Sequence, residues 1–270
     1  MINALVLAAG ESKRMGMPKP LLLFPRSMGV PPMSPRGIVP LDPKVNPGLI
    51  PEASAVGSSL GIPGNQQSME GRNVRGTHGR DGRAAHGRDA HATGGDTTFL
   101  EQIVSVLQRS EVNRITVVLG AEAARIQAAT DLSGVDVVLN EGYREGQLSS
   151  LIAGLRAVPP EAEAIVLCLV DDPFLTVESV DGVVGAFRAT GKPMVVPVFE
   201  GRRGHPTLFA RSMFAELLNA PAEEGARHVV QSHKDQVVEV DLPERAVLAR
   251  IDTPEDYLSH FGMAPRTIER

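Results

Sequence analysis

Between residues 115 and 199, short apolar runs alternate with segments of helical period. The runs are continuous and rich in β-branched residues, and at least ten residues separate each run from the next. Strands of this kind, joined by helices, form a mainly parallel sheet that is covered on both faces. The sequence therefore predicts a Rossmann-like α/β fold. The expected strands are residues 2–8, 115–120, 135–140, 164–170 and 193–199, and the expected helices are residues 121–130, 148–158 and 176–190.

A further helix is expected to begin after Thr98. Thr98 and Glu101 have the spacing of a capping box, and the apolar residues that follow share one helical face. Beyond residue 200 the alternation is less regular. It indicates a strand at residues 206–209, helices near 211–219 and 223–231, and apolar runs at 237–242 and 247–251.

Residues 26–95 differ in composition from the rest of the chain. Proline, glycine, serine, arginine and histidine dominate, and the tetrapeptide HGRD occurs twice. Such a segment buries too little apolar surface to offset its ordering entropy, so we predict a disordered insertion. We expect no dedicated metal site at its histidines, His78, His86 and His91. Residues 1–25 and 96–262 then form a single domain, and residues 263–270 form a tail.

Composition and charge exclude several functions. The formal net charge is −5, which argues against a nucleic-acid or anionic-membrane surface. The one cysteine, Cys168, lies within an apolar run and is expected to be a core residue. There is no basic segment before the short N-terminal apolar run, and no apolar stretch has transmembrane length. We therefore expect a cytoplasmic protein with no nucleic-acid or membrane partner.

The first expected strand ends abruptly at a glycine and continues into a small, basic loop. Gly10 and Gly16 allow a phosphate chain to approach the main-chain N–H groups, and Lys13, Arg14 and Lys19 bring positive charge. Neither the Walker pattern nor the G-x-G-x-x-G dinucleotide pattern fits this stretch. The loop is therefore expected to bind the phosphates of a nucleotide in a different way.

Residues 7–19 resemble the loop L-A-x-G-x-S-x-R-M-G-x-P-K of the MobA-like nucleotidyltransferases. The resemblance implies a fold of the nucleotide-diphospho-sugar transferase type. The closest branch is the molybdenum cofactor cytidylyltransferases, since Ala9 replaces the glycine of the guanylyltransferase branch and leaves less room for a purine. The resemblance further implies that Arg14 and Lys19 are catalytic. The residues that it implies bind the nucleotide are Leu7, Ala8, Ala9, Gly10, Glu11, Ser12, Arg14 and Lys19.

Two aspartates and a proline follow the expected strand at residues 164–170. Neighbouring residues of an extended chain point in opposite directions, so only one carboxylate faces a given site, and its position favours Asp171. The resemblance likewise implies that Asp171 is a catalytic magnesium ligand. Most cytidylyl-transferring relatives have glutamine at the position of Asp172. In this chain, Asp172 is assigned to substrate binding. Alternatively, one carboxylate caps the helix that begins near Thr176.

Asp252 is the expected partner of Asp171. Two carboxylates from different strands, together with phosphate oxygens and water, satisfy the octahedral preference of Mg²⁺. The segment from Asp252 to Pro254 also fits a helix start, with Asp252 or Thr253 as the cap. Members of the family that the chain resembles carry a similar segment. This similarity, together with the loop, favours a metal site at Asp252 over a helix cap.

Two further segments resemble motifs of the same family. Residues 145–155 place Ser149 and Ser150 at a helix start, where they are expected to contact the nucleotide, and Asn140 is a lesser candidate. Residues 201–209 resemble the G-x-x-G-H-P-x-L-F segment of the cytidylyltransferase branch. Arg203 and His205 of that segment are assigned to the substrate.

Together these features predict a Mg²⁺-dependent transfer of CMP from CTP to the phosphate of a molybdopterin-type cofactor, with release of pyrophosphate. A molybdoenzyme or its maturation chaperone would receive the product. Three alternatives remain: GTP as the donor, a sugar or polyol phosphate as the acceptor, and a nucleotide-binding regulator without turnover.

Overall fold

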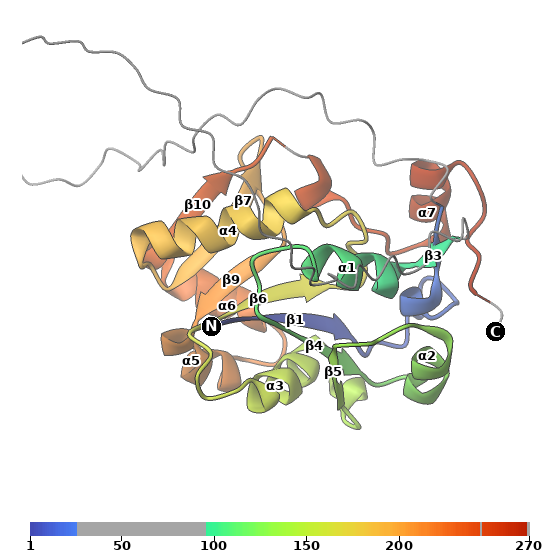
Figure 1. Cartoon of the computed structure of the whole chain (residues 1–270), viewed down its shortest axis with the longest axis horizontal. Coiled ribbons are helices and arrows are strands. Elements are labelled where there is room, and N and C mark those ends of the chain that lie inside the picture. The colour runs from blue at the N-terminus through green and yellow to red at the C-terminus, as the bar shows by residue number, and fades with distance from the viewer. Residues whose placement is uncertain (26–95, 244, 269–270) are drawn as a thin grey trace, which may run out of the picture. The chain divides into compact units, whose positions relative to one another are not determined.

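The N-terminal strand lies near the centre of an eight-stranded sheet (Figure 1). The computed structural model describes residues 1–25, 96–243 and 245–268, which belong to one compact unit. In spatial order the strands are β10 (Val237–Asp241), β7 (Met194–Phe199), β9 (Thr207–Ala210), β6 (Ala164–Leu169), β1 (Ile2–Ala8), β4 (Arg114–Leu119) and β5 (Asp136–Leu139), and β8 (Arg202–Arg203) pairs with β7.

The sheet is mainly parallel, as predicted. β1 runs parallel to β6 and β4, β4 to β5, and β7 to β10, whereas β9 runs antiparallel to both β6 and β7. None of the described helices is long and apolar enough to cross a bilayer. The helices are α1 (Phe99–Leu107), α2 (Ala123–Ala129), α3 (Gln147–Ala157), α4 (Val177–Thr190), α5 (Phe214–Leu218), α6 (Ala226–Ser232) and α7 (Pro254–Phe261).

Helices cover both faces of this sheet, which confirms the predicted fold class. Along β1, Ala4 and Val6 face a cluster that includes residues of α1 and α4. Leu5 and Leu7 face the opposite cluster, which includes residues of α3 and α5. Figure 1 shows α1 and α4 on one side of the sheet and α3 and α5 on the other. Burial on both faces explains why these strands have continuous apolar sequences.

The helix expected after Thr98 is α1, and its predicted capping box is present. The Thr98 hydroxyl accepts a hydrogen bond of 3.1 Å from the Glu101 amide. The Glu101 carboxylate accepts one of 2.9 Å from the Thr98 amide. These two bonds satisfy backbone donors that the first turn of a helix leaves free.

The chain on either side of residues 26–95 meets in a short sheet. Here β2 (Leu23–Phe24) pairs antiparallel with β3 (Thr97–Thr98), so the two flanks of the expected insertion lie side by side. The prediction of disorder, with the three histidines of that segment, falls outside the described residues. The expected tail is described to residue 268 and pairs with the chain that precedes β2, because Ile268 donates a hydrogen bond to the Leu21 carbonyl.

The expectation that the apolar run at residues 247–251 forms the strand that carries Asp252 is wrong. A 3₁₀ turn, Arg245–Leu248, is followed by an irregular segment that leads into α7. This turn packs on the chain between β8 and β9, where the Val247 carbonyl accepts a 3.1 Å hydrogen bond from the His205 amide. A Cβ atom placed on Gly204 would lie 1.9 Å from the Val247 oxygen. The glycine therefore permits a close contact that directs the chain away from the sheet.

We predict that Gly204→Ala lowers the free energy of unfolding by more than about 2 kcal/mol, because the new methyl group overlaps a backbone carbonyl. Denaturant unfolding followed by circular dichroism measures the change. Gly185→Ala is the control, since Gly185 lies inside α4 with open space at its Cβ position. That substitution should be neutral or stabilise by up to about 1 kcal/mol. Equal effects of the two substitutions would contradict the prediction.

Candidate active site

The loop after β1 is closed by Ser12. The Ser12 carbonyl accepts hydrogen bonds of 3.0 Å from the amides of both Met15 and Gly16. Its hydroxyl accepts one of 3.1 Å from the Lys19 amide. Ser12 and Gly16 have positive φ angles of 52° and 70°, so the loop turns back on itself before Lys19. The Ser12 side chain thus shapes the loop and holds the backbone of Lys19.

Lys19 lies between the two aspartates that the sequence paired. Its Nζ atom is 2.6 Å from Asp252 Oδ1 and 3.5 Å from Asp171 Oδ2. The Lys19 side chain is 11% exposed, so the ammonium group is held by these carboxylates with little water around it. Since one small cation contacts both carboxylates, the two aspartates lie close enough to share a cation.

Two arginines complete the charged cluster. Arg250 Nη2 lies 2.5 Å from Asp171 Oδ2, and Arg14 Nη2 lies 3.4 Å from Asp252 Oδ1. Burial by itself raises the pKa of the Asp252 carboxyl. The hydrogen bond and charge of Lys19, with the charges of both arginines, outweigh burial and hold this pKa below its usual value.

Asp252 reaches the cluster because another residue caps α7. The Thr253 hydroxyl accepts a 3.2 Å hydrogen bond from the Asp256 amide, and the Asp256 carboxylate accepts one of 2.9 Å from the Thr253 amide. The Ile251 amide donates a 2.8 Å hydrogen bond to the Asp171 carbonyl. The cap and the cluster are therefore both present, with Thr253 in the first and Asp252 in the second.

Asp171 and Asp172 lie in different surroundings, as expected, but a turn separates them rather than an extended chain. The strand β6 ends at Leu169, and the Asp172 amide donates a 3.0 Å hydrogen bond back to the Leu169 carbonyl. Asp171 lines the cavity described below, whereas Asp172 does not. Asp172 is buried, and its Oδ1 atom has no partner among the described residues. Burial and the nearby charge of Asp171 raise the pKa of Asp172 well above its usual value. Thr176, rather than either aspartate, caps α4, together with Ser179.

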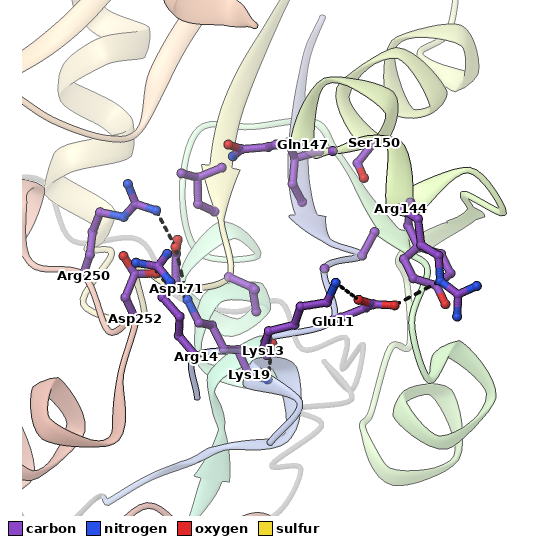
Figure 2. A pocket seen from close by; sticks show the side chains of 18 residues that line it. Glu11, Lys13, Arg14, Lys19, Arg144, Gln147, Ser150, Asp171, Arg250 and Asp252 are labelled. Atoms are coloured by element: carbon purple, nitrogen blue, oxygen red, sulfur yellow. Dashed lines mark hydrogen bonds and ion pairs between the residues drawn. The ribbon is translucent and has the colours of Figure 1, made fainter. Parts of the chain in front are cut away.

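These groups line a cavity of about 440 Å³ at the carboxyl ends of β1 and β6 (Figure 2). Its lining carries five basic and three acidic side chains, so it is positive in a chain whose net charge is negative. An anionic ligand suits such a cavity. Of the sequence candidates, those that line it are Leu7, Ala9, Gly10, Glu11, Ser12, Arg14, Lys19, Ser150, Asp171 and Asp252, and those that do not are Ala8, Ser149, Asp172, Arg203 and His205.

The two serines of α3 differ in their hydrogen bonds. The Asn140 side-chain amide donates to both hydroxyls, at 2.9 Å to Ser149 and 3.1 Å to Ser150. Ser149 in turn donates to the carbonyls of Gly142 and Gly146, at 3.0 and 2.8 Å. Among the described residues, Ser150 has no acceptor for its own proton. Asn140 thus leaves the Ser150 hydroxyl proton available, while Ser149 holds the preceding turn.

The structure does not bring Arg203 and His205 to this cavity. Arg203 lies at the surface, where its guanidinium is 2.7 Å from Glu239 of β10. The His205 Nδ1 atom is buried and has no partner among the described residues. Burial, and then the charge of Arg250, lower the pKa of His205. The segment assigned to the substrate supports the chain that carries Arg250 and Asp252. It does so through the hydrogen bond from the His205 amide to the Val247 carbonyl.

Sequence reasoning missed four polar side chains of the cavity: Tyr143, Arg144, Gln147 and Arg250. Arg144 donates a 3.0 Å hydrogen bond to Glu11, which also pairs with Lys13 at 2.8 Å. Figure 2 shows Arg144 and Glu11 at the opposite end of the cavity from Arg250. Arg250 lies only two residues before Asp252, so its nearness to the recognised segment was the signal that could have identified it.

The cluster fits a divalent cation that is held partly by substrate. The Asp171 and Asp252 carboxylates share one cation, and the buried Asp171 Oδ1 atom has no partner among the described residues. No group of three or more His, Cys, Asp and Glu side chains in the described ranges could enclose a metal. Mg²⁺ and Mn²⁺ prefer such oxygen ligands, and Mg²⁺ is commonly held by one or two carboxylates together with substrate phosphates.

The fold is of the kind found in nucleotidyltransferases, and residues 88–237 match the MobA-like NTP transferase domain. This match covers more than half of the chain, so the protein belongs to that family. It includes Asp171 but neither the loop at residues 7–19 nor Asp252.

Curated relatives have different names. A probable molybdenum cofactor guanylyltransferase of Mycobacterium avium (strain 104) is 29% identical over 168 residues, which are 60% of this chain and 80% of that protein. The nicotine blue oxidoreductase of Paenarthrobacter nicotinovorans is 24% identical over 169 residues, 58% of this chain and 80% of that protein. The finding supports the expected family but does not favour its cytidylyltransferase branch.

A solved structure has the same fold. The crystal structure of Rv0371c from Mycobacterium tuberculosis H37Rv superimposes with a TM-score of 0.64 at 24% identity, covering 97% of this chain and 98% of the other. A second structure of that protein is a complex with manganese, with a TM-score of 0.62 at 23% identity and the same coverage. A divalent cation is thus present in a protein of this fold.

We predict that Lys19→Met lowers the free energy of unfolding by about 2 kcal/mol in metal-free buffer, since it removes the cation that contacts both carboxylates. Urea unfolding in the presence of a chelator tests this. Lys13→Met is the matched control. Lys13 belongs to the same loop, but it is exposed and paired with Glu11, so its loss should change stability by no more than about 0.5 kcal/mol. A Lys19→Met protein as stable as the control would show that Lys19 does not stabilise the two aspartates.

Proposed function

We propose that this protein transfers CMP from CTP to the phosphate of a molybdopterin-type cofactor and releases pyrophosphate. The observation that carries the proposal is the positively charged cavity. There the loop after β1 faces Asp171 and Asp252, whose carboxylates both contact the Lys19 ammonium group. Ala9 lines the cavity, and its methyl group leaves less space for a purine than glycine would. GTP is the second candidate donor, because several similar curated proteins are named guanylyltransferases.

In the proposed reaction an oxygen of the acceptor phosphate attacks the α-phosphorus of CTP. The bond from that phosphorus to the bridging oxygen breaks, and pyrophosphate leaves with the bonding electrons. The attacking oxygen is already ionised, so no general base is required. The chain therefore contributes mainly positioning and charge stabilisation.

The loop and its basic residues are assigned to the triphosphate. The amides between Ala9 and Ser12, with Arg14 and Lys19, would stabilise the charge that develops on the departing pyrophosphate. Ser150 would donate a hydrogen bond to an uncharged edge of the nucleotide, since Asn140 already occupies its acceptor side. When bound, Mg²⁺ held by Asp171 and Asp252 would supply further neutralisation at the α-phosphate.

Lys19 and a divalent cation are alternatives at these carboxylates. In the described structure the lysine ammonium contacts both aspartates, and two cations cannot share that position without strong repulsion. The phosphates of a nucleotide give Lys19 another anionic partner. Metal and nucleotide are therefore expected to bind with positive coupling, each favouring the other.

The reaction is tested by measuring pyrophosphate release with Mg²⁺ and molybdopterin, with CTP, GTP, ATP and UTP supplied separately. We expect release with CTP, and a decrease of about 10²-fold in turnover for Arg14→Ala, which removes one stabilising cation. The stability of that variant should be unchanged, because the Arg14 side chain is 71% exposed. Release with GTP alone would assign the guanylyltransferase activity. Nucleotide binding without any release would indicate a regulator.

The coupling is tested by measuring Mn²⁺ binding by electron paramagnetic resonance, with and without CTP. Without nucleotide, Lys19→Met should bind Mn²⁺ about tenfold more tightly than the wild type, a difference of about 1.4 kcal/mol. CTP should increase Mn²⁺ affinity in the wild type more than in this variant. Lys13→Met should resemble the wild type, since Lys13 pairs with Glu11 instead. An unchanged affinity in Lys19→Met would show that Lys19 does not compete with the metal.

A further inference from the structure

Arg250 has more hydrogen-bonding capacity than its protein partners use. One guanidinium nitrogen, Nη2, donates to Asp171 Oδ2 at 2.5 Å. Within the described residues it makes no other hydrogen bond, although a guanidinium has five N–H donors. The side chain is 48% exposed and lines the cavity. Several donors therefore face a space that a ligand can enter.

The charge of Arg250 also exceeds what the aspartates require. Asp252 is already paired with Lys19 and Arg14, and Asp171 is 3.5 Å from Lys19. Three cations thus surround two carboxylates, before any divalent ion is counted. A half-buried guanidinium in such surroundings is best balanced by an additional anion.

Arg250 approaches Asp171 from a different part of the fold than the loop does. The loop follows β1, whereas Arg250 lies on the segment between the 3₁₀ turn Arg245–Leu248 and α7. In Figure 2 the labelled Arg250 lies away from Glu11 and Lys13 of the loop, with Asp171 between them. Arg14 and Lys19 of the same loop instead reach the two aspartates. In phosphoryl transfer the attacking and leaving oxygens are roughly in line on opposite sides of the phosphorus. If the loop amides near Glu11 and Ser12 hold the leaving pyrophosphate, the attacking group must come from the opposite side of the phosphorus, where Arg250 lies.

The segment that carries Arg250 is fixed at both ends. The Val247 carbonyl accepts from the His205 amide at 3.1 Å, and the Ile251 amide donates to the Asp171 carbonyl at 2.8 Å. The contact of Asp171 with Nη2 also restrains the guanidinium plane. A binding group held in this way loses little conformational entropy when a ligand arrives.

We propose that Arg250 binds the phosphate of the acceptor and presents its oxygen for attack. The inference deepens the proposed function and rests on it. It assigns recognition of the acceptor to Arg250, in place of the surface residue Arg203. The planar guanidinium can contact a phosphate through two N–H groups, which a lysine cannot do.

The test compares Arg250→Met with the wild type in two titrations. Isothermal calorimetry first gives the dissociation constant of CTP with Mg²⁺. Inorganic phosphate, as a probe of the acceptor site, is then titrated into protein loaded with Mg²⁺ and the α,β-methylene analogue of CTP, and ³¹P NMR follows its binding. We expect the variant to bind CTP within about twofold of the wild type and to lose phosphate binding by about tenfold or more. The KM for molybdopterin should rise by a similar factor.

Arg266→Met is the matched control. Arg266 is also a half-exposed arginine paired with an aspartate, at 3.2 Å from Asp96, but it lies outside the cavity lining. It should change neither titration. Arg250→Lys should recover part of the phosphate binding, because it restores the charge without the planar group.

Each other outcome overturns the inference in a distinct way. Equal weakening of CTP and phosphate binding would place Arg250 with the nucleotide, and weaker Mn²⁺ binding without loss of phosphate binding would make it a positioning residue for Asp171. Phosphate binding unchanged in Arg250→Met would leave the proposed function intact and remove Arg250 from it. If the wild type binds no nucleoside triphosphate, the proposed function fails, and this inference fails with it.

Discussion

The hydrogen bond from the Ile251 amide to the Asp171 carbonyl joins the two parts of the chain that form the charged cluster. Asp171 follows a central strand, β6, and is held by the core of the sheet. Arg250 and Asp252 belong to an irregular segment without a strand of its own. A single backbone contact thus places side chains separated by about eighty positions in the sequence within reach of one cation.

The surroundings of this segment explain why irregular chain can hold such a cluster. Gly204 allows the turn at Val247 to approach the backbone between β8 and β9, and Thr253 anchors the first turn of α7. The antiparallel strand β9 lies next to β6, so the chain that leads into β9 passes beside the end of the strand that carries Asp171. The G-R-R-G-H-P segment therefore contributes to the site by supporting it, whatever its relation to substrate.

The charges of the cavity explain both its stability without ligand and its suitability for one. Lys19, Arg14 and Arg250 compensate two aspartates that would otherwise repel each other. An arriving triphosphate adds negative charge, and a divalent cation adds positive charge, so the two together preserve the balance. The proposed reaction requires no general base in addition to this charge balance, because the attacking oxygen is already ionised.

Local sequence alone determined the fold class, the loop after β1 and most of the helix boundaries. Continuous β-branched runs require burial on both faces, and the capping box at Thr98 and Glu101 specifies a helix start through contacts between near neighbours. The expectation that only one of Asp171 and Asp172 faces the cavity is also met, although the turn after Leu169, rather than the alternation of an extended chain, separates the two side chains. The loop and the paired aspartates could be identified before any coordinates.

The tertiary structure decided what depends on contacts between distant residues. Edge position leaves Leu139 of β5 58% exposed, although its sequence resembles a buried strand. Residues 247–251 have strand-like composition, yet their contact with Gly204 and His205 directs them away from the sheet. Arg203 pairs with Glu239, whereas Arg250 reaches Asp171. Which arginine enters the cavity is set by long-range packing, and no local pattern of residues carries that information.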